Sequence, residues 1–166
     1  GKVVILYGDV PIIRPETLKN LIKKSIKNKE YATLLTAIYE NPTGYGRIIR
    51  DENQDLLKIV EQKDASEEEK LVKEINSGIY CFNGKSLRES LDLLDNNNAQ
   101  GEYYLTDTIQ IMRNKGLKVG AYNGSTIEEL MGVNSRVELS RAEDIMRKRI
   151  NETHMVNGVT IIDTNS

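Results

Sequence analysis

The feature that most constrains this fold is an apolar run near the start of the chain, residues 3–6, which ends abruptly in Tyr7-Gly8-Asp9-Val10-Pro11. The run does not alternate polar with apolar residues, so we expect a central strand of an α/β sheet, covered on both faces. Ligands of open α/β sheets bind beyond the carboxyl ends of the strands. Asp9 is therefore placed to hold a hard cation, although a plain turn is an equally good interpretation of Gly-Asp.

Length and charge restrict the class of protein. The chain of 166 residues fits one domain with a sizeable core. Its net charge of -2 offers no basic field, so we expect neither nucleic acid nor an anionic membrane as a partner. No apolar run reaches the ~18 residues of a membrane span, which favours a cytoplasmic location. The single cysteine, Cys81, lies inside an apolar run and is expected to be buried.

Strand-like and helix-like segments alternate along the chain, which predicts the α/β class. Helices are expected at 15–28, within 64–72, at 87–94, from 106 or 107 to 115, and at 135–156. Strands are expected at 32–39, at 74–82, at 118–122, at 159–163, and as a hairpin of 47–50 with 56–61. The last helix carries apolar residues among many charges, as an exposed connector would.

Two oxygen donors at opposite ends of the chain, Asp9 and Asn134, could share one Mg²⁺, which needs only one or two protein ligands beside phosphate and water. From the residues alone, a helix N-cap or a turn residue is the simpler interpretation of Asn134. Between them lie Gly46, whose backbone can contact a flat base or sugar, and Glu61 and Asn76, which can bind hydroxyl and amide groups.

Two further kinds of side chain carry less weight. His154, the only histidine, lies on the charged helix and is expected at the surface rather than in catalysis. Tyr103 and Tyr104 could belong to the core or line a sugar pocket, and the core is the simpler interpretation.

Six motifs in a fixed order give the chain a resemblance along its whole length. They occupy residues 7–11, 41–48, 59–65, 74–79, 96–107 and 132–136, and include Asn-Pro-Thr-Gly-Tyr-Gly-Arg-Ile and Asn-Asn-Asn-Ala-Gln-Gly-Glu-Tyr-Tyr-Leu-Thr-Asp. In these motifs the chain resembles the uridyltransferase domain of bacterial bifunctional N-acetylglucosamine-1-phosphate uridyltransferases/glucosamine-1-phosphate acetyltransferases. The resemblance implies a Rossmann-like nucleotidyltransferase fold, with a mixed, mainly parallel sheet followed by a long helix.

The resemblance also implies a reaction: UTP and N-acetylglucosamine 1-phosphate give UDP-N-acetylglucosamine and pyrophosphate, with Mg²⁺ as cofactor. Asp9 and Asn134 would bind the metal, and these two would be the catalytic residues. The residues implied to contact nucleotide or sugar are Tyr7, Gly8, Gly46, Glu61 and Asn76, with Glu102 and Tyr104 shaping the acetamide pocket.

The same resemblance implies how the chain is divided. Residues 1–134 would be the C-terminal half of the uridyltransferase domain, 135–158 a connector helix, and 159–166 the start of a left-handed β-helix. The glycine-rich nucleotide loop of the family precedes the residue equivalent to Gly1, so we expect the chain alone to be inactive. The first strand would then have one unpaired edge, which predicts self-association or a need for the absent half.

Two other functions stay open. The chain could be another sugar-1-phosphate nucleotidyltransferase, or a noncatalytic fragment that binds sugar nucleotides or serves assembly. A glycosyltransferase would be expected to carry Asp-x-Asp after its central strand, whereas Gly8-Asp9-Val10 has one carboxylate.

Overall fold

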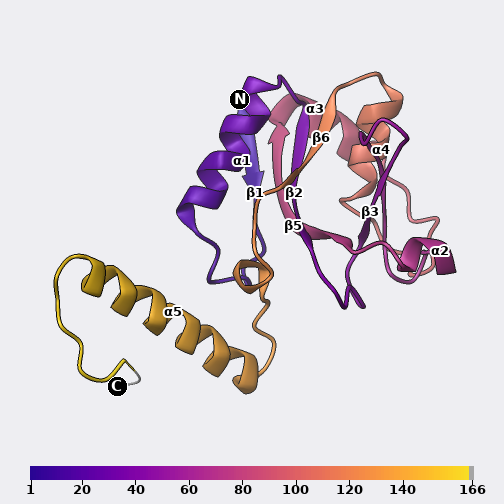
Figure 1. Ribbon diagram of the computed structural model, residues 1–166. Coiled ribbons are helices and arrows are strands. Elements are labelled where there is room, and N and C mark those ends of the chain that lie inside the picture. The colour runs from indigo at the N-terminus through magenta and orange to yellow at the C-terminus, as the bar shows by residue number, and fades with distance from the viewer. Residues whose placement is uncertain (165–166) are drawn as a thin grey trace.

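The computed structural model describes residues 1–164 and places helices on both faces of a six-stranded sheet (Figure 1). The strands are β1 (Lys2–Ile5), β2 (Ala32–Ile38), β3 (Arg47–Arg50), β4 (Leu56–Val60), β5 (Glu74–Asn83) and β6 (Val119–Asn123). The helices are α1 (Pro15–Lys27), α2 (Glu67–Lys70), α3 (Gly84–Leu91), α4 (Asp107–Asn114), α5 (Arg136–Val156) and the 3₁₀ turn η1 (Glu128–Leu130). The expected α/β class is confirmed.

Strand β5 organises the sheet. The order is β4-β3-β5-β2-β6, and β1 also pairs with β5. β1, β2 and β3 are antiparallel to β5, β4 is antiparallel to β3, and β6 is parallel to β2. It follows that β1, β2, β3 and β6 point one way while β4 and β5 point the other. The sheet is therefore mixed, with most strands in one direction, but β5 makes most neighbouring pairs antiparallel.

The prediction that residues 3–6 form a parallel strand in the middle of the sheet is wrong for the described chain, although Ile5 packs against the core layer on one face and Val4 against that on the other. β1 pairs with β5 alone among the described strands, antiparallel, with Lys2 opposite Asn83. Val3 is 41% exposed. The apolar sequence indicated a buried strand, but position in the sheet decides burial, and in this chain β1 lies at an edge. The expected unpaired edge is present.

The core forms one layer on each face of the sheet. Alternation along β2 sends Leu34 into one layer and Leu35 into the other. The Leu34 layer packs against α3 and α4 and holds the stacked rings of Tyr80 and Phe82, whose centroids are 5.3 Å apart. The Leu35 layer packs against α1 and contains Cys81, whose predicted burial is confirmed. Both faces of the sheet are thus covered by helices, which explains why strand-like and helix-like segments alternate along the sequence.

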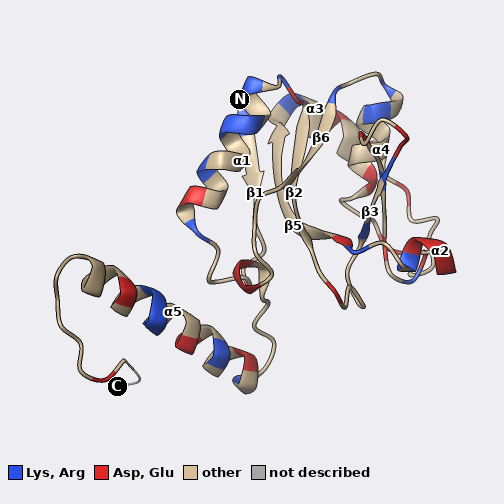
Figure 2. Cartoon of the chain, in the orientation of Figure 1, with Lys and Arg blue, Asp and Glu red and all other residues tan. Residues whose placement is uncertain are grey.

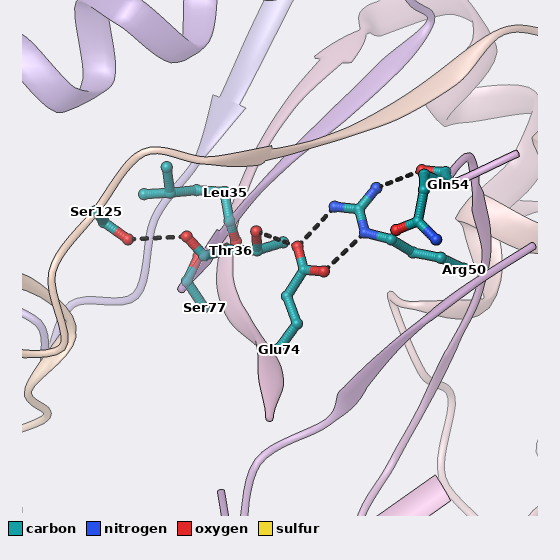
Figure 3. A network of polar contacts seen from close by, with 7 residues as sticks. All are labelled: Leu35, Thr36, Arg50, Gln54, Glu74, Ser77 and Ser125. Carbon is teal, nitrogen blue, oxygen red and sulfur yellow. Dashed lines mark hydrogen bonds and ion pairs between the residues drawn. The ribbon is translucent and has the colours of Figure 1, made fainter. Parts of the chain in front are cut away.

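A polar network ties β2, β3 and β5 together beside this core (Figure 3). Arg50 donates from Nε and Nη2 to the two carboxylate oxygens of Glu74, each at 2.7 Å. Thr36 Oγ1 also donates to Glu74 at 2.7 Å. Burial alone would raise the pKa of Glu74, but the hydrogen bonds from Arg50 and Thr36 outweigh it and lower that pKa. The network therefore holds an ionised carboxylate at one end of β5.

Helix ends follow local capping rules with small shifts from the expected bounds. Pro15 begins α1 at the first helical position, as predicted. Ser66 and Glu69 form a reciprocal capping box that starts the short α2. Asn83 accepts from the backbone of residues 85 and 86, so α3 begins at Gly84 rather than at 87. This earlier start arises from the Asn83 cap, which the apolar pattern does not reveal.

Helix α5 stands apart from the sheet (Figure 1), and Arg149 Nη1 donates to the carbonyl of Ile12, in the loop that joins β1 to α1, at 3.0 Å. Acidic and basic side chains alternate along it (Figure 2), and only Ala142 is buried, so the predicted exposed helix is confirmed. His154 is exposed, as expected. Within the described residues, no helix is long and apolar enough to cross a bilayer.

The strand expected at residues 159–163 is absent from the described chain, which is irregular from 159 to 164. A strand needs a neighbour for its backbone hydrogen bonds, and this segment has none, so the prediction from β-branched composition was wrong. Residues 165 and 166, the end of the proposed β-helix start, lie outside the described residues.

Candidate functional site

A cleft of about 530 Å³ opens where the sheet splits. β2 pairs with one edge of β5 from Glu74 to Phe82, so β1 and β3 share the other edge, at residues 80–83 and at Ile75. The backbone between them is left without a neighbouring strand. Six of the predicted site residues line the cleft: Tyr7, Asp9, Gly46, Glu61, Asn76 and Asn134.

The unpaired stretch of β5 satisfies its own backbone. Asn76 Oδ1 accepts from the amide of Gly78 at 3.1 Å, and Ser77 Oγ accepts from the amide of Ile79 at 3.1 Å. Asn76 Nδ2 donates to the hydroxyl of Tyr80 at 2.7 Å, and Ser77 Oγ donates to the carbonyl of Leu35 at 2.7 Å. Asn76 is thereby held in one orientation, with a second N–H and a second lone pair still free for a ligand.

The ring of Tyr7 lies against Gly78. A Cβ at Gly78 would fall 1.8 Å from a ring carbon of Tyr7, and Gly78 has φ +75°. Glycine is required here for both reasons. Burial first, and then the carboxylates of Glu61 and Asp9, raise the pKa of the Tyr7 phenol. The phenol therefore stays protonated, as a hydrogen-bond donor between the two sides of the cleft.

Glu61 follows β4 and faces the loop that enters β3. A Cβ on Gly46 would lie 3.3 Å from both carboxylate oxygens of Glu61. Glu61 accepts from Thr106 Oγ1 at 3.3 Å. Burial raises the pKa of Glu61, against the smaller effect of the Thr106 bond. A half-desolvated carboxylate of this kind is a strong acceptor for a sugar hydroxyl or an amide N–H.

Asp9 and Asn134 meet around Gly132. The backbone N–H of Val133 donates to the carbonyl of Asp9 at 2.8 Å. A Cβ on Gly132 would lie 3.4 Å from the Asn134 amide and 3.7 Å from the Asp9 carboxylate. Carboxylate and amide oxygens suit Mg²⁺, which usually takes few protein ligands. The described residues contain no group of three or more His, Cys, Asp and Glu arranged for a metal. The pair therefore fits Mg²⁺ completed by phosphate and water rather than an all-protein metal cage.

The N-cap interpretation of Asn134 is wrong. Ser135 caps α5 and accepts from the amide of Glu138, while the Glu138 carboxylate accepts from the amide of Asn134 at 2.7 Å. This bond first, and then further bonds from Ser135, lower the pKa of Glu138. The Asn134 side chain is not used in capping.

Three predicted residues do not line the cleft. Gly8 is exposed in the turn beside it, and Glu102 is exposed on the loop before α4. The hydroxyl of Tyr104 accepts from Gln100 at 2.8 Å and donates to Asp64 at 3.2 Å. Tyr104 lines an adjoining hollow of about 320 Å³ with Tyr7 and Glu61. Tyr104 and Tyr103 thus lie at the surface, and the core interpretation of the pair is wrong.

Sequence reasoning missed residues that α5 brings to the cleft. Glu138 and Arg141 both line it, and Arg141 is the basic residue among the described lining residues. Glu138 and Arg141 lie three positions apart on α5, on one face of the helix. No local pattern distinguishes them from the other charged residues of α5, because their place at the cleft depends on how the helix packs.

The fold and the cleft define a class of protein. The family model described as "Nucleotidyl transferase" matches residues 1–127, and the chain belongs to this family. The curated relatives carry a more specific name than this family. The chain is 76% identical to the "Bifunctional protein GlmU" of Clostridioides difficile over 99% of its length, and 52% identical to that of Bacillus subtilis over 98%. It spans 36% of the length of each of these relatives.

Solved structures agree on the fold alone. The chain superposes with a TM-score of 0.61 on a Bacillus anthracis protein described as a candidate glucose-1-phosphate thymidylyltransferase, at 18% identity, covering 98% of this chain and 57% of that one. A UDP-glucose pyrophosphorylase complexed with UDP-glucose gives a TM-score of 0.54 at 14% identity, covering 78% and 50%. The nucleotidyltransferase-like sheet is therefore shown.

Proposed function

We propose that this chain supplies the sugar-phosphate and metal side of an enzyme that makes UDP-N-acetylglucosamine and pyrophosphate from UTP and N-acetylglucosamine 1-phosphate. One observation carries the proposal: the sheet split gathers Tyr7, Asp9, Gly46, Glu61, Asn76 and Asn134 into one cleft. The similarity to bifunctional GlmU proteins supports the choice of substrates.

The reaction requires positioning and charge neutralisation rather than a covalent enzyme intermediate. A phosphate oxygen of the sugar phosphate attacks the α-phosphorus of UTP, and pyrophosphate leaves. Asp9 and Asn134 would hold Mg²⁺, which supplies charge neutralisation at the phosphates. Arg141, which also lines the cleft, would supply a cation for phosphate oxygens.

The sugar would be held by the wall that β5 and Glu61 form. Glu61 would accept from an N–H or hydroxyl of the N-acetylglucosamine unit, and the free N–H and lone pair of Asn76 would bind neighbouring polar groups. Tyr7 would donate a hydrogen bond from its phenol to a polar group of the ligand where the sugar meets the phosphate. Tyr104, beside Glu61, would border the acetamide group, whereas Glu102 has no contact with the cleft.

A second candidate is a noncatalytic binding or assembly unit, favoured by the unpaired edge of β1. Such an edge would pair either with further sequence of a longer protein or with a second copy of this chain. A concentration-dependent increase in sedimentation rate would support pairing between copies. A monomer at high concentration would contradict it.

Pyrophosphate release tests the proposal directly. We expect the longer protein, carrying this sequence with the family's nucleotide loop, to release pyrophosphate from UTP and N-acetylglucosamine 1-phosphate, and to stop when EDTA removes the metal. We expect the chain alone to be inactive but to bind the sugar phosphate. No turnover by the longer protein with any nucleoside triphosphate would contradict the enzyme proposal and leave the binding role.

A further inference from the structure

The two sides of the Asp9–Asn134 pair belong to segments far apart in the chain, and one buried carboxylate joins them. Glu129, in η1, is 5% exposed. It accepts from Thr17 Oγ1 at 2.6 Å and from the backbone N–H of Arg14 at 3.3 Å. The Nε of Arg14 lies 3.5 Å from its other oxygen. Both carboxylate oxygens therefore engage the start of α1.

The start of α1 has no cap of its own. Arg14 stands at the N-cap position and its side chain makes no capping bond. The first amides of a helix need acceptors, and the positive end of the helix dipole favours a negative charge. Glu129, from a distant part of the chain, accepts from the amide of the N-cap residue itself and places its carboxylate at the positive end of α1.

This contact lies close to both proposed metal ligands. Arg14 follows Asp9 by five residues, and Glu129 precedes Asn134 by five. Among the described residues, the hydrogen bonds that join residues 9–17 to residues 126–134 are the two accepted by Glu129 and the one from Val133 to Asp9. The separation of Asp9 and Asn134 is thus set by a backbone bond at one end and by Glu129 at the other.

We propose that Glu129 is a positioning residue for metal binding: it touches neither metal nor substrate, and it holds the Asn134 segment against the Asp9 turn. This inference rests on the proposed function, because it requires Asp9 and Asn134 to bind the metal. A role limited to the stability of α1 is the competing explanation.

The test compares four variants of the longer protein: Glu129→Ala, Glu129→Gln, Thr17→Val and Glu128→Ala. Mn²⁺ binding is measured from the free-ion EPR signal, and N-acetylglucosamine 1-phosphate binding by calorimetry without metal. Groups that orient ligands change metal affinity by about 10–100-fold, so we expect Glu129→Ala to weaken Mn²⁺ binding at least about tenfold. Glu129→Gln keeps an acceptor for Thr17 and should restore most of that loss. Glu128 is exposed on the same turn, so Glu128→Ala should leave Mn²⁺ binding unchanged.

The sugar-phosphate affinity separates positioning from stability. We expect it to stay within about twofold in every variant, because the wall at Glu61 and Asn76 does not depend on Glu129. Should Glu129→Ala not fold, Thr17→Val removes one of the bonds and is expected to weaken Mn²⁺ binding severalfold. Parallel loss of both affinities would overturn the inference, as would unchanged Mn²⁺ binding in Glu129→Ala and Thr17→Val. Wild-type protein without Mn²⁺ binding would instead overturn the proposed metal site itself.

Discussion

The two sides of the cleft are built in different ways. On the proposed sugar side, Asn76 and Ser77 lie on a buried strand and are fixed by hydrogen bonds to Tyr80 and Leu35. On the proposed metal side, Asp9 and Asn134 are exposed on two loops joined by a single backbone bond and by Glu129. Mutations in the buried strand should therefore change the stability of the fold, whereas mutations of the exposed Asp9 and Asn134 should change ligand binding and leave stability nearly unchanged.

The difference suits the ligands proposed for each side. A sugar offers many similar hydroxyls, and preformed acceptors with fixed geometry distinguish them. A magnesium ion brings water and phosphate as most of its ligands, so the protein needs to supply only a few oxygens in the open.

The largest effect is expected on the sugar side from Gly78→Ala. The new Cβ would overlap the Tyr7 ring and force alanine into φ +75°. The two effects together should lower the free energy of unfolding by about 3 kcal/mol, as measured by urea denaturation. In a Tyr7→Ala background the steric part disappears, and only about 1 kcal/mol should remain. An equal loss in both backgrounds would show that Tyr7 does not pack on Gly78.

A smaller loss is expected from Glu74→Gln, which weakens the bidentate pair with Arg50 (Figure 3). Hydrogen bonds to charged groups support a decrease of about 2 kcal/mol near neutral pH. Because the folded pKa of Glu74 is lowered, its contribution is present above the ordinary value of 4.5 and is lost as the pH falls through the folded value. Variant and wild type should therefore converge in acid-induced unfolding curves. A constant difference down to the acid transition would contradict the ionised pair.

Glu61 should show the opposite sign. Its raised pKa means that the folded state holds the proton more tightly, so its ionisation lowers the unfolding free energy as the pH rises from the ordinary 4.5 to the folded value. Sugar-phosphate affinity should fall as the pH drops through that same folded value, by up to about tenfold per pH unit below it. Calorimetry should compare wild type with Glu61→Gln at the same pH values, because the titration of the ligand phosphate affects both affinities equally and cancels in the comparison. A parallel pH profile in the two proteins would exclude Glu61 as the acceptor.

The smallest effect on stability is expected from Asp9→Asn on the metal side. Asp9 is exposed, so the unfolding free energy should change by less than about 0.5 kcal/mol. Mn²⁺ binding, measured by EPR, should nevertheless be lost. A large change in stability would mean that the two sides of the cleft do not differ as described.

Local patterns in the sequence predicted most helices and strands, because the signals that start these elements and the apolar spacing within them lie in the elements themselves. Pro15 and the apolar spacing that follows it define α1, and the β-branched residues of 32–38 define β2. β1 was misplaced because its burial depends on neighbours, which no local pattern records. Residues 159–163 have strand composition, but no strand of the described chain pairs with them, so composition alone failed there.

The candidate site also contains residues that the sequence predicts and residues that it does not. Asp9 and Asn134 could be paired from the chemistry of oxygen ligands, and the structure brings their segments together. Arg141 and Glu129 could not be ranked among many similar charged residues, because their positions depend on how α5 and η1 pack. The sequence-based expectation that Tyr104 belongs to the core failed because the loop before α4 carries it to the surface.

The bond from Val133 to Asp9 also has a consequence for the order of folding. It closes a loop of about 120 residues, and in the entropy of chain closure this costs about 2 kcal/mol more than a turn of ~10 residues. The β3–β4 hairpin, by contrast, closes locally through Asp51 and Asp55. We expect the hairpin to form early and the contact between Val133 and Asp9 to form late. The proposed metal site would then be completed only after the sheet has formed, so metal ions have little opportunity to direct folding.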